Sequence, residues 1–440
     1  MESFDKILKN GTVFLPTGRV NTDVGIKDEK IAYIGSCDHA SEIIDCTNLF
    51  IFPGLIDTQC HFREPGGEHK ETIKTGTQAA ALGGMIGIFE MPNTNPLTTT
   101  PEALTHKINR GVDTAYTDFA YYFGGTYQNS SNLSEWENLP GVCGVKIFMG
   151  ASTGNLLSAT DKEVEAVVSN GKRVIAVHAE DEFLMNENKE HILKDSTDVG
   201  MHCKWRDVNS SLNATQRVVR LAKKHSRHVH VLHITTAEEM DFLRQNKDTA
   251  TVEVLPNHLT LHAPDCYEQL GTLAQQNPPI REKHHQDALW RAIDDGTVDI
   301  VASDHAPHTL EEKGGIYPNT PSGTPGVQTL LPIMLDHASN GKLSYERLVE
   351  LMAYGPIKVH KIKNKCSITL GYDADFTVVD PKLTHTITNV EQASKSAWTP
   401  YDGKKITGMP VMTVIRGNIV MRDGQLLERI IPKPIVFNIN

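Results

Sequence analysis

Leu49-Phe-Ile-Phe-Pro-Gly-Leu-Ile-Asp-Thr-Gln-Cys-His-Phe-Arg-Glu-Pro-Gly66 joins an apolar run to a short polar segment. The apolar part, up to Ile56, is typical of a buried strand, and the polar part is typical of a loop at its end. Gln59 and His61 are two positions apart, so they project to the same side of an extended chain. His61 and Arg63 therefore predict a metal ligand and an anion-binding group close together at the end of this strand. Position 59, the natural place for a second imidazole, holds an amide.

The same alternation of apolar run and polar segment continues along the chain, with helix-like stretches between the runs. Eight strand–helix alternations indicate an α/β fold, a closed (β/α)8 TIM-type barrel rather than an open sheet. The predicted strands are Ile51–Ile56, Met85–Phe89, Asp118–Phe123, Val145–Met149, Arg173–Val177, Val229–Leu232, Thr251–Leu255 and Asp299–Ala302. The predicted helices include Thr72–Leu82, Asp161–Ser169, Asn213–Lys224 and Gln286–Asp294.

Both ends of the chain consist instead of short strand-like pieces separated by turn residues. We therefore predict that residues 1–51 and 365–440 form one small composite β-sandwich domain. Residues 52–364 would form the barrel, inserted between the two halves of that domain. The length of 440 residues fits this division, because an α/β barrel of about 250 residues folds as a single unit.

Composition narrows the class of partner. The net charge of −11 argues against nucleic acid or an anionic membrane surface, and no apolar run approaches the roughly 18 residues of a membrane span. The first residues lack a signal-peptide pattern, and the seven cysteines are scattered without a C-x-x-C pair. We therefore expect reduced thiols, a cytoplasmic location and a small-molecule substrate.

Polar side chains stand in or directly after five of the predicted strands. In barrels of this kind the carboxyl ends of the strands converge on the active site. Any one histidine, in a chain with 20, is more often a surface or core residue than a metal ligand. The prediction therefore depends on the common position of these polar side chains at the strand ends. Together they suit a metal such as Zn²⁺. The candidate ligands are His61, Lys146, His178, His233 and Asp304.

Lys146 stands inside an apolar strand, where an ammonium group is costly to bury. One interpretation is a structural lysine whose side chain reaches the rim of the barrel. The sharper one is chemical: a buried lysine with a lowered pKa reacts with CO₂ and becomes a carbamate, a carboxylate-like metal ligand.

These residues resemble the amidohydrolase superfamily, and within it the dihydroorotases, over nearly the whole chain. The superfamily marks are Pro53-Gly-Leu-Ile-Asp57, Val145-Lys-Ile-Phe-Met149, His178, His233, Asp304 and Gly371-Tyr-Asp-Ala-Asp-Phe376. The dihydroorotase marks are His61-Phe-Arg-Glu-Pro-Gly66, Met91-Pro-Asn-Thr94, Asn277-Pro-Pro-Ile-Arg281 and Asp304-His-Ala-Pro-His308.

The resemblance implies a role for each matching position. Zinc would be held by His61, Lys146 as N6-carboxylysine, His178, His233 and Asp304. The substrate's α-carboxylate would be held by Arg63, Asn93 and His308, which offer a bidentate fork and further donors. Asn277 would contact the ring amide, and a homodimer is expected.

The chain departs from the family pattern at three places. Gln59 replaces a histidine, and because an amide oxygen is a weak zinc ligand, we expect one tightly held zinc, with two as the alternative. Gly150-Ala-Ser-Thr153 holds no acid that could replace a carboxylated Lys146. The loop 309–326 lacks the expected aromatic residue before Gly326, which leaves its role in substrate closure open.

The implied reaction is the reversible cyclisation of N-carbamoyl-L-aspartate to L-dihydroorotate in pyrimidine synthesis. Metal-activated hydroxide would attack the ring carbonyl, with Asp304 as general acid and base. A hydantoinase or allantoinase is one alternative, but neutral hydantoins offer no carboxylate to Arg63 and His308. A non-catalytic scaffold homologue is the other, and only Gln59 favours it.

Overall fold

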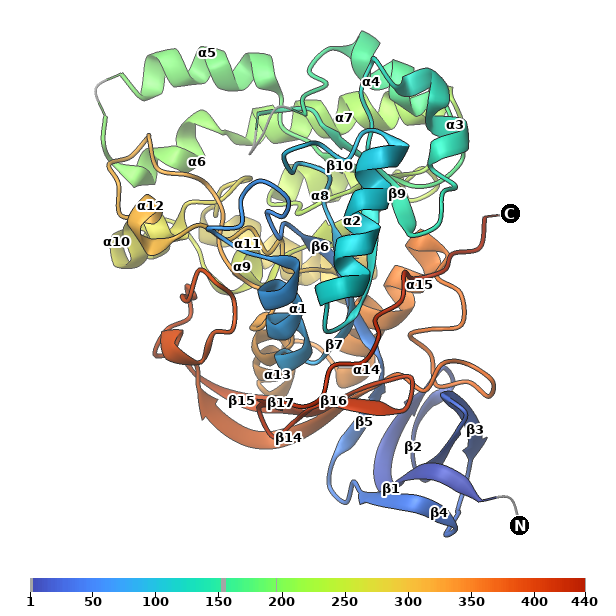
Figure 1. Ribbon diagram of the computed structural model, residues 1–440. Helices are drawn as coiled ribbons and strands as arrows, with labels where there is room; N and C mark the ends of the chain where they lie inside the picture. The colour runs from blue at the N-terminus through green and yellow to red at the C-terminus, as the bar shows by residue number, and fades with distance from the viewer. Residues whose placement is uncertain (1–2, 152–155, 195, 440) are drawn as a thin grey trace.

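The computed structural model describes residues 3–151, 156–194 and 196–439, and two sheets organise them (Figure 1). The middle of the chain forms an eight-stranded parallel sheet surrounded by helices. Strands from both ends of the chain form a second, nine-stranded sheet, drawn below the barrel in Figure 1. The predicted α/β fold with a TIM-type barrel and a composite β unit is confirmed.

The barrel strands pair in chain order, each parallel to the next. A parallel bridge between Cys60 and His305 joins the first strand to the segment after the last, and the His61 N–H donates to the His305 carbonyl at 2.7 Å. The sheet is thereby closed. Its strands are β6 (Leu55–Cys60), β7 (Met85–Glu90), β8 (Asp118–Gly124), β9 (Val142–Phe148), β10 (Ile175–His178), β11 (Val229–Val231), β12 (Ala250–Val254) and β13 (Ile300–Val301).

The strand predicted over Ile51–Ile56 is two strands, and that prediction is wrong. β5 (Phe50–Pro53) belongs to the terminal sheet, whereas β6 begins the barrel one residue later, after Gly54. A Cβ at Gly54 would lie 2.6 Å from the Ile86 side chain and 2.8 Å from that of Asp375. The crossing between the two sheets therefore requires glycine.

The terminal sheet is composite because β5 pairs with a strand from the other end of the chain. Phe52 and Pro53 are in antiparallel register with Thr377 and Phe376. Its strands are β1 (Phe4–Leu15), β2 (Gly18–Lys27), β3 (Lys30–Ile34), β4 (Ala40–Asp45), β5, β14 (Phe376–Thr386), β15 (Lys405–Ile415), β16 (Asn418–Arg422) and β17 (Gln425–Leu426). The domain boundaries proposed at residues 51 and 364 stay a prediction.

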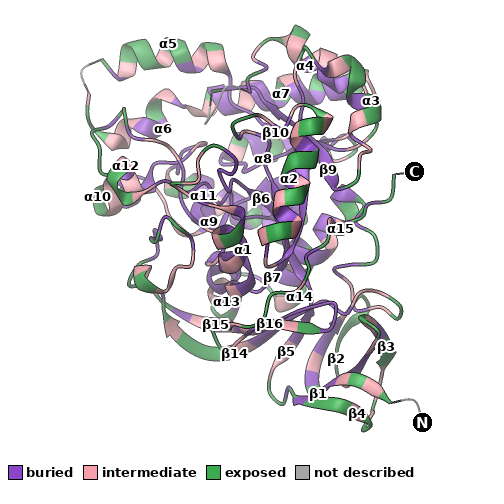
Figure 2. Cartoon of the chain, in the orientation of Figure 1, coloured by how far each residue is buried: buried purple, intermediate pink, exposed green. Residues whose placement is uncertain are grey.

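The helix α2 has an exposed side, seen as green turns in Figure 2, and a buried side that includes Leu104, Lys107 and Gly111. α7 begins earlier than predicted because the Asp207 carboxylate caps it, accepting from the Ser210 N–H at 2.8 Å. None of the helices in the described ranges is long and apolar enough to cross a membrane. The helices are α1 (Ile73–Leu82), α2 (Pro101–Thr114), α3 (Leu133–Trp136), α4 (Asp161–Val168), α5 (Glu182–Ile192), α6 (His202–Trp205), α7 (Val208–Lys224), α8 (Ala237–Arg244), α9 (Pro256–Thr260), α10 (Asp265–Leu270), α11 (Lys283–Asp294), α12 (Leu310–Lys313), α13 (Leu330–Ser339), α14 (Tyr345–Val349) and α15 (Gly355–His360).

The C-terminal tail returns to the amino-terminal end of the barrel strands. The Ile435 N–H donates to the carbonyl of Phe119, at the start of β8, at 2.8 Å. Ile435 and Phe437 are both buried there. The tail thus packs at the end of the barrel opposite the carboxyl ends of the strands.

Candidate active site

The barrel strands carry the five predicted metal ligands, and among them His61 contacts Asp304 and His178 contacts His233. All five side chains belong to buried residues, none more than 9% exposed. Electrostatic interactions link them into one group, because Lys146 and Asp304 each act on other members. The members are His61 after β6, Lys146 in β9, His178 at the end of β10, His233 after β11 and Asp304 after β13.

Asp304 is the polar centre of one half of this group. Its Oδ1 lies 3.2 Å from His61 Nε2 and accepts a hydrogen bond from Gln59 Nε2 at 3.0 Å. Both side chains reach the same oxygen because they leave the same face of the chain, as predicted. Burial alone raises the pKa of Asp304, but the hydrogen bond from His61 and nearby basic groups hold it below its ordinary value. Asp304 is therefore an ionised carboxylate.

His178 and His233 form the other half, with His178 Nδ1 3.0 Å from His233 Nε2. On its far side, His178 Nε2 donates to Glu180 Oε2 at 2.9 Å. Arg206 in turn donates from Nε to Glu180 Oε1 at 3.1 Å. This carboxylate keeps the proton on Nε2, so the lone pair of Nδ1 points towards His233. We did not predict Glu180, although an acid two residues after a strand-end histidine was a usable signal.

Lys146 is fully buried, so the interpretation of a lysine reaching the rim is wrong. Its Nζ has no hydrogen-bond partner among the described residues and lies 4.4 Å from the centre of the Phe148 ring. Burial lowers its pKa to about 7. A neutral amine is therefore populated near neutral pH, and the neutral amine is the form that reacts with CO₂.

Glu253, near the end of β12, is a second buried acid that we did not predict. Its carboxyl group accepts from Thr58 Oγ1 at 3.2 Å and from the His233 N–H at 3.4 Å. Burial and the nearby charge of Asp304 raise its pKa to about 8. An acid inside the apolar run Thr251–Leu255 was the same kind of signal as Lys146.

Three predicted site residues have backbone conformations that side chains rarely adopt. Arg63, His233 and Asp304 have φ angles of 62°, 39° and 46°. Such non-glycine conformations cost about 1–3 kcal/mol each and gather at functional sites, where the surrounding structure holds them. The strain at these three positions agrees with a site built for chemistry.

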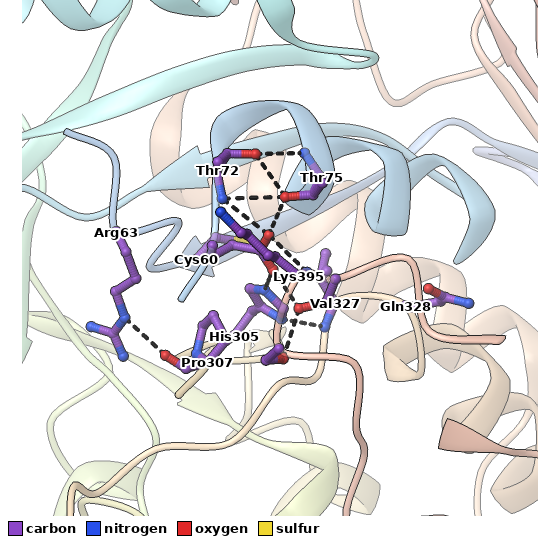
Figure 3. Close-up of polar contacts among 12 residues, drawn as sticks. Cys60, Arg63, Thr72, Thr75, His305, Pro307, Val327, Gln328 and Lys395 are labelled. Carbon is purple, nitrogen blue, oxygen red and sulfur yellow. Dashed lines mark hydrogen bonds and ion pairs between the residues drawn. The ribbon is translucent and has the colours of Figure 1, made fainter. Parts of the chain in front are cut away.

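Arg63 and His308 form a basic group beside the predicted ligands. Arg63 donates from Nε to the Pro307 carbonyl at 3.2 Å (Figure 3), and its Nη2 lies 3.3 Å from His308 Nε2. Within the described ranges, Arg63 pairs with no carboxylate. Burial lowers its pKa to about 10, so it stays charged. A buried guanidinium that contacts no described carboxylate is suited to an anionic ligand.

Three of the four predicted substrate-binding residues line two cavities. Arg63 and Asn93 line one of about 590 Å³, and Asn93 Oδ1 lies 2.7 Å from His61 Nδ1. Asn277 lines another of about 370 Å³, where its Oδ1 accepts from His202 Nε2 at 2.9 Å. His202 was not predicted, and nothing in the sequence around it signals its role.

A second layer of contacts fixes the segment that carries Asp304. Asp57 Oδ1 accepts from the Ser303 N–H at 3.1 Å and from the Gln59 N–H at 3.2 Å. His305 Nδ1 accepts from the Gly326 and Val327 N–H groups at 3.0 and 3.3 Å. These contacts tie the segment after β13 both to β6 and to the loop before α13, as the dashed lines around His305 show in part (Figure 3).

Glu71 supports His305 from behind. Its Oε2 accepts from His305 Nε2 at 3.1 Å, and its Oε1 accepts from the Lys395 N–H at 3.2 Å. Figure 3 shows the Thr72 and Thr75 contacts at the start of α1 and Lys395 beside them. A loop between β14 and β15 therefore contributes to the support of the active site.

The predicted metal ligands do not form a compact site, but several of their polar atoms lack partners. Among the described residues, no three His, Cys, Asp or Glu side chains gather closely enough to hold a metal by themselves. The set instead consists of two contacting pairs, His61 with Asp304 and His178 with His233, and of Lys146, which interacts electrostatically with both pairs. Lys146 Nζ, Gln59 Oε1 and His233 Nδ1 are buried polar atoms that no described group satisfies, and such atoms call for a ligand. The second half of the acid-free segment Gly150-Ala-Ser-Thr153 falls on residues 152–155, which lie outside the described part of the chain.

The model of the amidohydrolase family matches residues 50–420. The chain belongs to the amidohydrolase family. Within it, the chain is similar to the dihydroorotase of Methanothermobacter thermautotrophicus, with 34% identity over 417 residues and 93% of each chain covered. It is also similar to the dihydroorotase of Bacillus licheniformis, with 33% identity, 96% of this chain and 99% of the relative. The predicted family, the dihydroorotases of the amidohydrolase superfamily, is confirmed.

Solved amidohydrolase structures share the fold. The L-hydantoinase (dihydropyrimidinase) of Arthrobacter aurescens superposes with a TM-score of 0.92 and 29% identity, covering 97% of this chain and 98% of its own. The dihydropyrimidinase of Brevibacillus agri gives a TM-score of 0.90 and 26% identity, with 96% of each chain covered. The architecture is thus common to enzymes named for different cyclic amides, and the site must distinguish among them.

Proposed function

We propose that this amidohydrolase is a dihydroorotase, which interconverts N-carbamoyl-L-aspartate with L-dihydroorotate and water in pyrimidine synthesis. The observation that carries the proposal is Arg63, a buried guanidinium beside the candidate ligands that pairs with no described carboxylate. L-Dihydroorotate is a cyclic amide that carries a carboxylate. The similarity to curated dihydroorotases over more than nine-tenths of the chain supports the same substrate.

The metal of this site is zinc in our proposal. His61, His178, His233, Asp304 and a carboxylated Lys146 would hold it, and a bound zinc ion supplies Lewis-acid activation of water and of the ring carbonyl. The lowered pKa of Lys146 supports carboxylation. Gln59 presents its amide nitrogen to Asp304, which supports a single tightly held zinc rather than two.

Asp304 is the proton carrier. Its Oδ1 is engaged by His61 and Gln59, whereas no described residue hydrogen-bonds to Oδ2. In ring opening, Oδ2 takes the proton of the attacking water and delivers it to the leaving amide nitrogen. In ring closure the same carboxyl group starts protonated and works in the opposite direction.

Three side chains hold the substrate's carboxylate away from the reacting carbonyl. Arg63 provides the charge and a planar fork, and His308 and Asn93 add donors. The His308 ring accepts from Lys70 Nζ at 3.0 Å through Nδ1, and its single N–H at Nε2 donates to the Ser322 carbonyl at 3.1 Å. To donate to the substrate, this N–H would have to turn from that carbonyl to the carboxylate. Asn277 would contact the ring amide, with its own amide oriented by His202. This binding energy positions the ring for attack.

A hydantoinase activity is the second candidate, and the superposition on the Arthrobacter L-hydantoinase favours it. A carboxylate-free ring would leave Arg63 buried without a counter-ion, which costs binding energy. A scaffold without activity is disfavoured, since it has no use for a strained and buried polar cluster. A homodimer and a cytoplasmic location stay predictions.

A turnover assay in both directions tests the proposal. The purified, zinc-loaded chain should hydrolyse L-dihydroorotate and cyclise N-carbamoyl-L-aspartate. The matched control is Asp304→Asn, which keeps the shape of the side chain but cannot carry the proton. Zinc-loaded protein that turns over neither compound would refute the proposal.

A further inference from the structure

Lys313, at the end of α12, is fully buried, as Lys146 is. Its Nζ donates to three backbone carbonyls: those of Gln275 at 2.9 Å, Pro321 at 3.1 Å and Gly323 at 3.1 Å. No carboxylate of the described residues pairs with it. An ammonium group has three N–H donors, so three carbonyl dipoles take the place of a counter-ion here.

These carbonyls belong to two segments beside the predicted substrate-binding residues. Gln275 precedes Asn277 by two positions, and both line the 370 Å³ cavity together with Pro321 and Ser322. Between the two carbonyls from the loop, the Ser322 carbonyl accepts from His308 Nε2 at 3.1 Å. Lys313 thus joins the segment that contacts His308 to the segment that carries Asn277.

Gln275 reinforces the same junction. Its Nε2 donates to the Thr320 carbonyl at 2.9 Å and to Ser322 Oγ at 3.1 Å. Its backbone carbonyl also accepts from the Gly323 N–H at 2.9 Å. Gly323 itself has a φ of 139°, and a Cβ there would lie 2.4 Å from the Ala306 carbonyl oxygen. Residues 320–323 therefore pack closely against the segment between Asp304 and His308.

We propose that Lys313 is a positioning residue that fixes residues 320–323 against His308 and Asn277. Burial lowers the pKa of Lys313 to about 7. In its protonated form the ammonium group also adds positive charge near the carboxylate pocket, because carbonyl dipoles orient towards it without neutralising it. Lys313 is one of the charges that lower the pKa of His308, which supports their proximity. The inference rests on the proposed function, in which His308 and Asn277 bind the substrate. It assigns the loop 309–326 a role in substrate binding.

The test is Lys313→Met, which keeps much of the length of the side chain and removes its donors and charge. We expect the KM for L-dihydroorotate to rise about tenfold or more, because three hydrogen bonds and a nearby charge are lost. We expect kcat to change by less than about threefold and zinc content to be unchanged, since Lys313 contacts no candidate ligand. The matched control is Lys365→Met, another buried lysine, which pairs with Asp118 near the other end of the barrel; its KM should stay at the wild-type value.

Hydrogen exchange on the full chain without substrate gives a second readout. Lys313→Met should accelerate exchange of the Gly323 N–H and of the Ala306 N–H, which donates to the Thr324 carbonyl. If Lys313→Met fails to fold, Gln275→Ala takes its place, because it loosens the same segment but retains the lysine. Gln275→Ala should raise both the exchange rates and the KM. Unchanged KM and unchanged exchange in these variants would overturn the inference. A wild-type chain inactive on dihydroorotate would refute the proposed function, and exchange would still decide the role of Lys313.

Discussion

Gln59 Nε2 donates to Asp304 Oδ1 at 3.0 Å, the oxygen that also lies 3.2 Å from His61 Nε2. The amide therefore uses its donor on the proposed proton carrier, and its Oε1 is buried without a described partner. An imidazole at this position would offer a stronger nitrogen ligand from the same face of the strand. This relationship sets the expected metal content.

The purified protein should contain nearer one zinc than two per chain. Gln59→His should raise the zinc content towards two, because it restores a strong ligand beside His61. Metal analysis of both proteins after dialysis measures this, with His178→Ala as the control that should lose zinc. Two fully retained zinc ions in the unaltered protein would contradict the expectation and leave the proposed reaction untouched.

Lys146→Ala should lose zinc and activity together. Its Nζ is buried without a described hydrogen-bond partner, and Gly150 and Ala151, which follow, offer no acid to replace a carbamate. Short carboxylic acids such as acetate or propionate should restore part of both by occupying the space of the carbamate. A variant that keeps its zinc and near-normal turnover would make Lys146 a structural lysine.

Arg63→Met should raise the KM for L-dihydroorotate while the zinc stays bound. The loss of this charge-assisted contact should lower kcat/KM by a factor that corresponds to about 2–4 kcal/mol of transition-state stabilisation. Metal analysis and steady-state kinetics measure the two effects separately. An unchanged kcat/KM would place the substrate's carboxylate elsewhere.

Lys365 is expected to matter for stability and not for catalysis. Its Nζ lies 2.8 Å from Asp118, 3.0 Å from Asp373 and 2.8 Å from Asp375. Lys365→Met leaves buried carboxylates without their partner, so unfolding should become easier by about 3–5 kcal/mol. Chemical denaturation measures this loss.

The pH dependence of that loss has a definite sign. Burial alone lowers the pKa of Lys365, but the three aspartates outweigh it and raise the pKa above its ordinary 10.5. A group whose pKa is higher in the folded chain stabilises the fold fully at pH values below its pKa in the unfolded chain. This stabilisation is lost as the pH rises through its pKa in the folded chain. The difference between wild type and Lys365→Met should therefore be constant from about pH 6 to 9 and shrink only in strong alkali. A difference that falls between those two pH values would contradict the assignment.

The sequence predicted the barrel and the chemical residues well because both follow simple spacing rules. Gln59 and His61 share a face because strands have a period of two, and Lys146 was conspicuous as a charge in an apolar strand. The boundary at Gly54 was missed because the residues on both sides are equally apolar. Pattern alone does not show that a run continues from one sheet into another.

The supporting residues were harder to predict. Glu253 could have been found by the rule that identified Lys146, since it too interrupts an apolar run. Glu71, His202 and Lys313 lie in loops or at helix ends, where charged residues are common and their partners come from distant segments. Their roles depend on tertiary contacts that have no signature in local sequence.

The central claim is that Arg63 selects a substrate with a carboxylate. The most direct measurement compares kcat/KM of the unaltered protein for L-dihydroorotate and for 5,6-dihydrouracil, the same ring without the carboxylate. We predict a preference for L-dihydroorotate of at least about a hundredfold, in line with the loss of one charge-assisted pair. Equal turnover of the two rings, or a preference for dihydrouracil, would contradict the account and favour a hydantoinase.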